Sequence, residues 1–164
     1  MSALPHIRTA VPADAQAAID LVRRSIIELC HMDHGGDRWT LEGWLANKTV
    51  DNMTHWIGRP GTNVFIAEIE GAMAGVGAVT DQGEILLAYV DPAHRFKGVT
   101  KAMVGEMERL AKEVRAERMQ LTTTETARAF YTALGYVPED EPGDIFSDDA
   151  NVLIKEFPQE DGQA

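Results

Sequence analysis

One stretch of the sequence decides the fold: Glu84-Ile85-Leu86-Leu87-Ala88-Tyr89-Val90-Asp91-Pro92-Ala93-His94-Arg95-Phe96-Lys97-Gly98-Val99-Thr100. Its first part, residues 85–90, is an apolar run rich in β-formers, which predicts a strand. Pro92 ends the strand, because it has no amide hydrogen for a ladder and restricts the residue before it. Apolar residues then recur on one helical face at Val99, Met103, Met107, Leu110 and Val114. The stretch therefore predicts a strand, a short basic turn and a helix.

The turn has the properties of an anion site. The first amides of a helix lack internal partners, and the helix dipole adds partial positive charge there. Gly98 places no side chain against an approaching group, and Arg95 and Lys97 add full charges. These features favour a phosphate or pyrophosphate, although many strand-to-helix turns carry one glycine and two basic residues.

Two motifs carry a resemblance to a known family. The first is Val90-x-Pro92-x-x-Arg95-x-x-Gly98-x-Thr100. It resembles the pyrophosphate loop of the GNAT superfamily of N-acetyltransferases, which is Gln/Arg-x-x-Gly-x-Gly/Ala. Thr100 departs from that pattern, in which the last position is Gly or Ala. A β-branched side chain there crowds the phosphates, but the amide of Thr100 stays available.

The second motif is Thr124-x-x-Ala127-x-x-Phe130-Tyr131-x-x-Leu134-Gly135-Tyr136. It resembles the family's Asn/Ser-x-x-Ala-x-x-Phe-Tyr-x-x-Leu-Gly-Phe segment and follows the first motif in the expected order. An N-terminal segment, Ile7-Arg8-x-Ala10-x-Pro12-x-Asp14, adds to the likeness. Together these segments extend the resemblance over most of residues 5–157.

Size and charge limit the class of protein. The 164 residues suit one domain, 1–164, and the net charge of −11 argues against nucleic acid, which needs clustered Lys and Arg. The acidic balance is compatible with a cationic substrate, although an acidic surface often serves solubility alone. The single cysteine, Cys30, fits a reducing compartment. Without a membrane span or signal peptide, we expect a cytoplasmic location and no membrane partner.

The remaining patterns predict an α/β fold. The N-terminal half should contain a strand at 4–9, a helix to about residue 29, a loop at 31–37, one or two short helices within 39–57 and an antiparallel three-stranded meander over 63–90. The 99–114 helix then forms a right-handed parallel crossover to a strand at 118–123. A helix capped by Thr124 and closed by Gly135 follows, then a strand at 136–138, an acidic loop at 139–149 and a last strand at 151–157. We expect a GNAT-like mixed, mostly antiparallel sheet flanked by helices, with a splayed strand pair.

The resemblance implies where acetyl-CoA, the expected co-substrate, would bind. In the family the central strand and the crossover strand separate at a bulge, and the pantetheine arm bonds the central strand's backbone. This places Ala88, Tyr89 and Val90 beside the pantetheine, although the same residues are equally consistent with sheet core. The remaining residues assigned to the co-substrate are Arg95, Phe96, Lys97, Gly98, Val99, Thr100, Lys101 and Thr124.

The resemblance also implies catalytic residues. Tyr131 matches the family tyrosine near the sulfur, which acts as general acid; the alternative is a core tyrosine. The amide of Tyr89 or Val90 at the bulge could hold the thioester oxygen. Glu84 stands where some relatives carry a catalytic glutamate base, but a solvated glutamate next to a turn is equally plausible. Glu68 is an alternative base, and water relays replace a single base in many relatives.

The loop after the first helix has two interpretations. Its acidic and histidine side chains, His31, Asp33, His34 and Asp37, could supply metal ligands, but their spacing is irregular and we predict no metal. Walling the acceptor pocket is the better interpretation, with Trp39 and Trp44 contributing. Burial in the core is the alternative for both tryptophans and is favoured for Trp44. Arg128 either reaches the cofactor's adenosine phosphates or faces water.

The sequence thus predicts an acetyl-CoA-dependent N-acetyltransferase that transfers acetyl directly to a primary amine of a small-molecule acceptor. One alternative is a non-catalytic acyl-CoA-binding or regulatory domain. The other is an enzyme that acetylates a protein N-terminus or lysine. Homodimers are frequent among similar proteins, and the sequence itself does not specify an oligomeric state.

Overall fold

The fold was analysed in a computed structural model that describes residues 4–29, 35–139 and 152–158. Its elements are β1 His6–Thr9, η1 Pro12–Asp14, α1 Ala15–Leu29, α3 Arg38–Leu45, α4 Val50–Gly58, β2 Thr62–Ile69, β3 Ala72–Thr80, β4 Ile85–Val90, η2 Pro92–His94, α5 Val99–Glu113, β5 Arg118–Thr122, α6 Glu125–Ala133, β6 Val137–Pro138 and β7 Val152–Glu156. The predicted α/β class and element order are confirmed.

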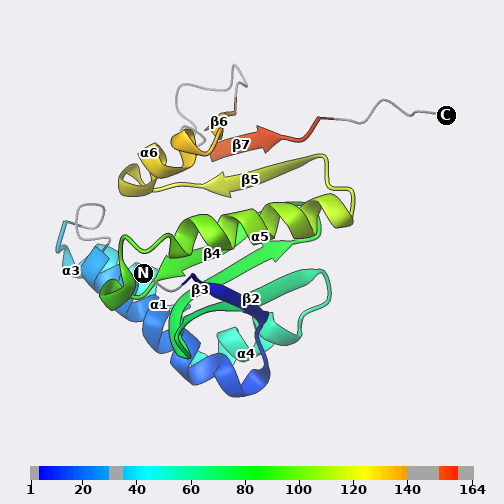
Figure 1. Cartoon of the computed structure of the whole chain (residues 1–164). Coiled ribbons are helices and arrows are strands. Elements are labelled where there is room, and N and C mark those ends of the chain that lie inside the picture. The colour runs from blue at the N-terminus through cyan, green and yellow to red at the C-terminus, as the bar shows by residue number, and fades with distance from the viewer. Residues whose placement is uncertain (1–3, 30–34, 140–151, 159–164) are drawn as a thin grey trace.

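The strands form two sheets. The first has four antiparallel strands in the order β1-β2-β3-β4, and the second has the order β5-β7-β6, also antiparallel. Among the described residues, pairing links the two sheets only at an isolated parallel bridge between Glu84, which directly precedes β4, and Gln120 of β5. The mixed sheet expected from the sequence is therefore two antiparallel sheets (Figure 1), and they meet at one parallel contact.

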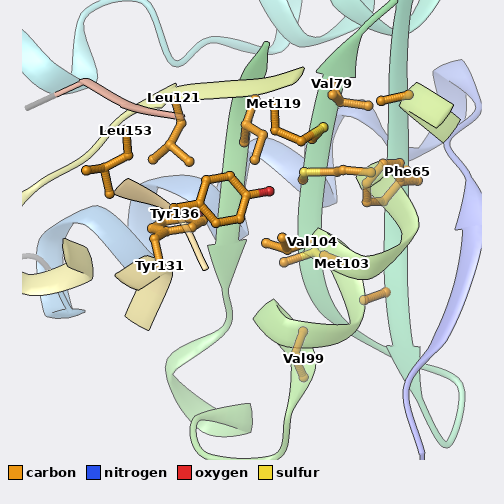
Figure 2. Packing of buried hydrophobic residues seen from close by; sticks show 14 of the residues in the cluster. Phe65, Val79, Val99, Met103, Val104, Met119, Leu121, Tyr131, Tyr136 and Leu153 are labelled. Carbon is orange, nitrogen blue, oxygen red and sulfur yellow. The ribbon is translucent and has the colours of Figure 1, made fainter. Parts of the chain in front are cut away.

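Helices cover both faces of the first sheet. One buried cluster joins α1 and α4 to the sheet and includes Ile19, Val22 and Met53. The other joins α5 to the opposite face and continues into the second sheet through Met119, Tyr136 and Leu153 (Figure 2). The site described below lies where these clusters end, between the two sheets.

Two glycines of β3 allow α5 to pack closely on the sheet. A Cβ on Gly75 would lie 2.7 Å from Cγ1 of Val99 on α5, and one on Gly77 would lie 2.9 Å from Cε of Met107 on α5. Such contacts are shorter than side chains tolerate in a packed interior. Because these glycines have no side chains, α5 and the turn before it can lie directly against β3, the strand that pairs with β4.

The predicted apolar stripe of α5 is wrong at its last position. The helix ends at Glu113, and Val114 is the C-cap with φ −91° and ψ 8°, half exposed. Because Val114 has left helical geometry, its side chain no longer follows the buried face. Val104 and Ala111 complete that face instead, at 0% and 1% exposure.

An ion-pair network fixes the start of the chain. Both terminal nitrogens of Arg8 donate to Asp14, at 2.8 and 2.9 Å, and its Nε donates to Glu68 at 2.8 Å. The hydrogen bonds from Arg8 hold the pKa of Asp14 below its usual value. Glu68, the alternative base, is thus engaged in a structural ion pair. In the described part of the chain, every helix is too short or too polar to cross a bilayer.

Candidate active site

The outer edge of β4 leaves part of its backbone unpaired by a strand. On the inner edge the Asp91 N–H donates to the Ala74 carbonyl at 2.8 Å. Antiparallel ladders alternate, so the backbone of Tyr89 also points toward β3, whereas the N–H and C=O of Ala88 and Val90 point away from it. Of the two amides proposed from the sequence for the thioester oxygen, only that of Val90 therefore faces outward.

The facing edge of β5 shows the same alternation. The Gln120 N–H donates to the Gly83 carbonyl at 2.9 Å, so residue 120 points toward β4. Two residues further on, the backbone of Thr122 faces the same way, but β4 makes no ladder with it. The strands are therefore joined at Gly83–Glu84 and separated beyond it, which confirms the predicted splayed pair.

The bulge lies earlier in β4 than the sequence predicted. Ala78 pairs with Leu87 and Val79 with Ile85, so the register shifts at Leu86. An extra residue in one strand bends it and increases its twist. The shift at Leu86 thus marks the point where β4 turns away from β5, and it lies three or more residues before the expected Tyr89–Val90.

A cavity of about 820 Å³ opens between the separated strands. This volume falls in the range of small-molecule and cofactor sites. We call the part between residues 86–90 of β4 and residues 121–124, at the end of β5 and just after it, the β4–β5 cleft. The remaining walls come from the turn before α5 with its first helical turn, from α6, and from α1 with the segment around α3.

The turn before α5 supplies unpaired amides to this cavity. Gly98 is the helix N-cap, with φ +76° and no side-chain cap, and its carbonyl accepts the first helical hydrogen bond from Ala102 at 3.0 Å. The amides of residues 99–101 therefore lack helical partners. Arg95 stacks over the ring of Phe96, with its Cζ 4.7 Å from the ring centroid.

Nearly all of the predicted phosphate-loop residues line the cavity. They are Arg95, Phe96, Gly98, Val99, Thr100 and Lys101, together with Thr124 at the start of α6. Lys97 is exposed and is not part of the lining. The turn also contributes His94, which the sequence reasoning did not select. Its Nδ1 is buried with no hydrogen-bond partner among the described residues.

Tyr131 reaches the cavity from α6. Thr124 caps this helix, as predicted, by accepting from the Ala127 N–H at 3.3 Å. Tyr131 is 5% exposed, and its ring packs edge-to-face against Phe130 at a centroid distance of 5.1 Å. The same ring packs edge-to-face against Tyr136 at 5.5 Å (Figure 2). Burial, with a smaller contribution from Tyr89, raises the pKa of Tyr131 to about 12. The phenol therefore keeps its proton at neutral pH and can donate it.

Glu84 is the predicted catalytic residue that the structure does not bring to the cavity. It is exposed, it takes part in the backbone bridge at the joined end of the two strands, and it is not in the cavity lining. The following residues, Ile85 and Leu86, do line the cavity. Glu84 thus lies just beyond the closed end of the β4–β5 cleft.

The cavity wall formed by α1 and the segment around α3 was the part of the site least well predicted from the sequence. It contains Ser25, Ile26, Leu29, Gly43, Trp44, Asn47 and Lys48. Trp44 lines the cavity and also packs on the buried cluster of α1 and α4, so both interpretations of Trp44 hold. Trp39 is 83% exposed and is not in the lining. No sequence motif indicated Asn47 or Lys48.

Of the four loop side chains considered as metal ligands in the sequence, the structure describes only Asp37. Asp37 caps α3 by accepting from the Thr40 N–H at 3.0 Å. His31, Asp33 and His34 lie outside the described residues. Elsewhere in the described ranges no three His, Cys, Asp or Glu side chains are grouped to hold an ion.

Comparisons with known proteins agree with this geometry. Residues 34–144 match the family model described as "Acetyltransferase (GNAT) domain". The chain belongs to the GNAT acetyltransferase family. A search of curated proteins finds no match to the sequence.

Solved GNAT structures share the fold. A GCN5-related N-acetyltransferase from Rhodopseudomonas palustris superposes with a TM-score of 0.80 at 20% identity, over 96% of this chain and 98% of the other. PaiA N-acetyltransferase from Thermoplasma acidophilum, in complex with coenzyme A, gives 0.78 at 17% identity over 93% and 99%. A GNAT acetyltransferase from Brucella melitensis, in complex with acetyl-CoA, gives 0.63 at 16% identity over 93% and 88%.

Proposed function

We propose that this GNAT protein is an acetyl-CoA-dependent N-acetyltransferase that transfers acetyl directly to a primary amine of a small acceptor. One observation carries the proposal. The unpaired backbone of β4, the free amides of α5 and the buried phenol of Tyr131 all border one cavity. Family membership supports acetyl transfer, and the cavity supports a co-substrate that is extended and anionic at one end.

The residues present fit acetyl-CoA. Its pantetheine arm carries amide groups, which can pair with the outward N–H and C=O of Ala88 and with the outward C=O of Val90 as an added strand would. Its pyrophosphate suits the free amides of residues 99–101, where the helix dipole also favours negative charge. Arg95 and Lys101 add two cations in the same lining. Thr100 contributes its amide, and its hydroxyl can add a further bond.

The chemistry requires the acceptor nitrogen to lose two protons, the sulfur to gain one, and one developing charge to be stabilised. The amine nitrogen bonds to the thioester carbonyl carbon, and the carbon–sulfur bond breaks as the amide forms. The outward N–H of Val90 is placed to hold the carbonyl oxygen as it gains charge. Tyr131 gives its proton to the leaving thiolate and regains one from solvent. The acceptor's ammonium loses one proton before it attacks and a second as the amide forms, and both leave through water, because Glu84 lies outside the cavity lining.

Substitution of Tyr131 tests the proposal. Titration calorimetry should show acetyl-CoA binding to the wild type, and CoA release should depend on an added amine. Tyr131→Phe should keep acetyl-CoA binding and lower kcat by about a hundredfold, the usual scale of general-acid catalysis. Tyr136→Phe is the matched control, because it removes the hydroxyl of the neighbouring ring, which is buried in the core.

The outcomes separate the alternatives. Acetyl-CoA binding without turnover across a broad panel of small amines would favour a non-catalytic acyl-CoA-binding domain. Turnover only with peptides carrying a free N-terminus or lysine would favour a protein acetyltransferase. Equal activity of Tyr131→Phe and Tyr136→Phe would exclude Tyr131 as the acid.

A further inference from the structure

We propose that the acceptor amine carries an anionic group, a carboxylate or a phosphate, and that Lys48 holds this group. The inference rests on the proposed function and names the substrate class for the same cavity. It concerns the wall formed by α1 and the segment around α3, to which the family motifs assign no ligand.

The charge of the cavity lining is opposite to that of the whole chain. The sequence has 26 acidic and 15 basic residues, yet the described residues that line the cavity include no Asp or Glu. Their cations are Lys48, Arg95 and Lys101. The last two flank the free amides of α5, where the co-substrate's phosphates fit. Lys48 is the cation on the other wall, and it has no counter-charge there.

Lys48 is half-buried and has no carboxylate partner among the described residues. Its Nζ donates to Oδ1 of Asn47 at 2.6 Å, which uses one of its three N–H donors. Burial lowers the pKa of the ammonium, because the charge is partly withdrawn from water. An anion bound in the cavity would take up the remaining donors and offset that desolvation.

The backbone around Lys48 is fixed in place. Nη1 of Arg23, on α1, donates to the carbonyls of Leu45 and Lys48 at 3.0 and 3.1 Å. Nδ2 of Asn52, on α4, donates to the carbonyl of Asn47 at 2.7 Å. The turn between α3 and α4 is therefore held from two helices. Such preorganisation lowers the cost of ordering a binding residue when the ligand arrives.

The neighbours of Lys48 define the rest of the acceptor. Leu29 and Trp44, both partly exposed, provide apolar surface in the same wall, and Ser25 is buried there at 3% exposure. An acceptor with an apolar body and an anionic group would place the body on Leu29 and Trp44 and the anion on Lys48. Its amine would then be free to approach the β4–β5 cleft.

Pairs of amines that differ only in the anionic group provide the first test. Suitable pairs are phenylalanine with phenethylamine, tryptophan with tryptamine, and lysine with cadaverine for the carboxylate, and phosphoethanolamine with ethanolamine for the phosphate. CoA release should give a kcat/KM about tenfold or more higher for the anionic member of at least one pair. Preference within the first three pairs identifies a carboxylate, and preference within the fourth identifies a phosphate.

Lys48→Gln provides the second test, with Arg38→Gln as the matched control. Arg38 is 88% exposed on α3 and pairs with Glu42, so its loss changes the net charge equally without touching the cavity. Lys48→Gln should raise the KM of the preferred anionic acceptor about tenfold and change its kcat and the KM of acetyl-CoA less than about twofold. Lys48→Arg should restore most of the preference.

Three results would overturn the inference. The neutral member of every pair could be the better substrate, and the proposed N-acetyltransferase activity would then still stand. Lys48→Gln could raise the KM of acetyl-CoA instead, which would assign Lys48 to the co-substrate. Acetyl-CoA binding without turnover of any amine would remove the inference together with the enzyme, and it would be recognised by the absence of CoA release.

Discussion

The two ends of the β4–β5 pair differ in what their backbone groups bind. At the joined end the Gly83 carbonyl accepts from the Gln120 N–H at 2.9 Å, and Gly83 is buried against β5. At the separated end the backbone of Ala88, Val90 and Thr122 borders an 820 Å³ cavity. The same two strands are thus a packed interior at one end and a binding surface at the other.

The difference shows how a fold makes a binding site without dedicated side chains. Backbone N–H and C=O groups that leave water need partners, and the outer edge of β4 has no partner strand beyond the bridge at Glu84. A ligand with amides of its own can restore those hydrogen bonds. The separation of β5 from β4 therefore creates the backbone part of the binding site. Side chains supply the charges at the end of the cavity.

The largest expected effect comes from proline substitutions on the two sides of β4, at β3 on its inner edge and at its own outer edge. Ala78 lies in β3, between two partner strands, whereas Ala88 presents its N–H to the cavity. Ala78→Pro should prevent folding, because it removes a ladder hydrogen bond inside the sheet. Ala88→Pro should fold and lose about tenfold or more in acetyl-CoA affinity, because its ring replaces the free N–H.

Circular dichroism and titration calorimetry on the two proline variants check this pair. An Ala88→Pro protein that binds acetyl-CoA as the wild type does would show that the outer edge of β4 is not the pantetheine site. A well-folded Ala78→Pro protein would contradict the ladder described for β3.

A smaller effect compares glycines at the two ends of the pair. Gly83 has φ +86°, and a Cβ there would lie 2.0 Å from the carbonyl oxygen of Arg118; Gly98 has φ +76° and nothing within 4 Å of its Cβ position. Gly83→Ala should lower the free energy of unfolding by about 3 kcal/mol or more, from backbone strain and the clash. Gly98→Ala should cost about 1 kcal/mol and raise the acetyl-CoA KM instead.

Urea unfolding with parallel measurement of CoA release distinguishes the two alanine variants. If Gly83→Ala affected only the acetyl-CoA KM while Gly98→Ala lost stability, the assignment of a packed end and a binding end would be reversed.

The elements of the fold could be predicted because local signals agree with their tertiary setting. The β-formers of residues 85–90 and the turn at Pro92 stand where the structure has a strand and a turn. Val114 shows where this fails: apolar spacing continues past the helix, but the chain leaves helical geometry after Glu113. Periodicity alone does not register the end of a helix.

The site could be predicted only where motifs cover it. The splayed pair and Tyr131 came from the family resemblance, since nothing in the composition of β4 or β5 shows that they separate. Leu86 is one apolar residue in an apolar run, so the register shift there leaves no local signal. Lys48 is a single lysine between two short helices, and its place in the cavity depends on Arg23, which is distant in sequence.

Substitution of Glu84 tests whether the reacting site ends at the closed end of the β4–β5 cleft. Because it is exposed and outside the cavity lining, Glu84→Gln should lower kcat/KM by less than about threefold and leave the pH profile unchanged. Initial rates across pH for wild type and variant measure this. A loss of about a hundredfold, together with loss of the acidic limb of the profile, would instead identify Glu84 as the base that deprotonates the acceptor.

The smallest effect concerns Tyr136, which stands behind Tyr131 on the packed side. Its ring is fully buried, and its hydroxyl has no hydrogen-bond partner among the described residues. An unsatisfied buried hydroxyl carries a desolvation cost without a compensating bond. Tyr136→Phe should therefore leave the free energy of unfolding unchanged or raise it by up to about 1 kcal/mol, with kcat and KM unaffected. Urea unfolding and CoA release measure both quantities. A clear loss of stability would show that the Tyr136 hydroxyl is satisfied in solution, and a loss of kcat would extend the reacting site past the Tyr131 ring into the core.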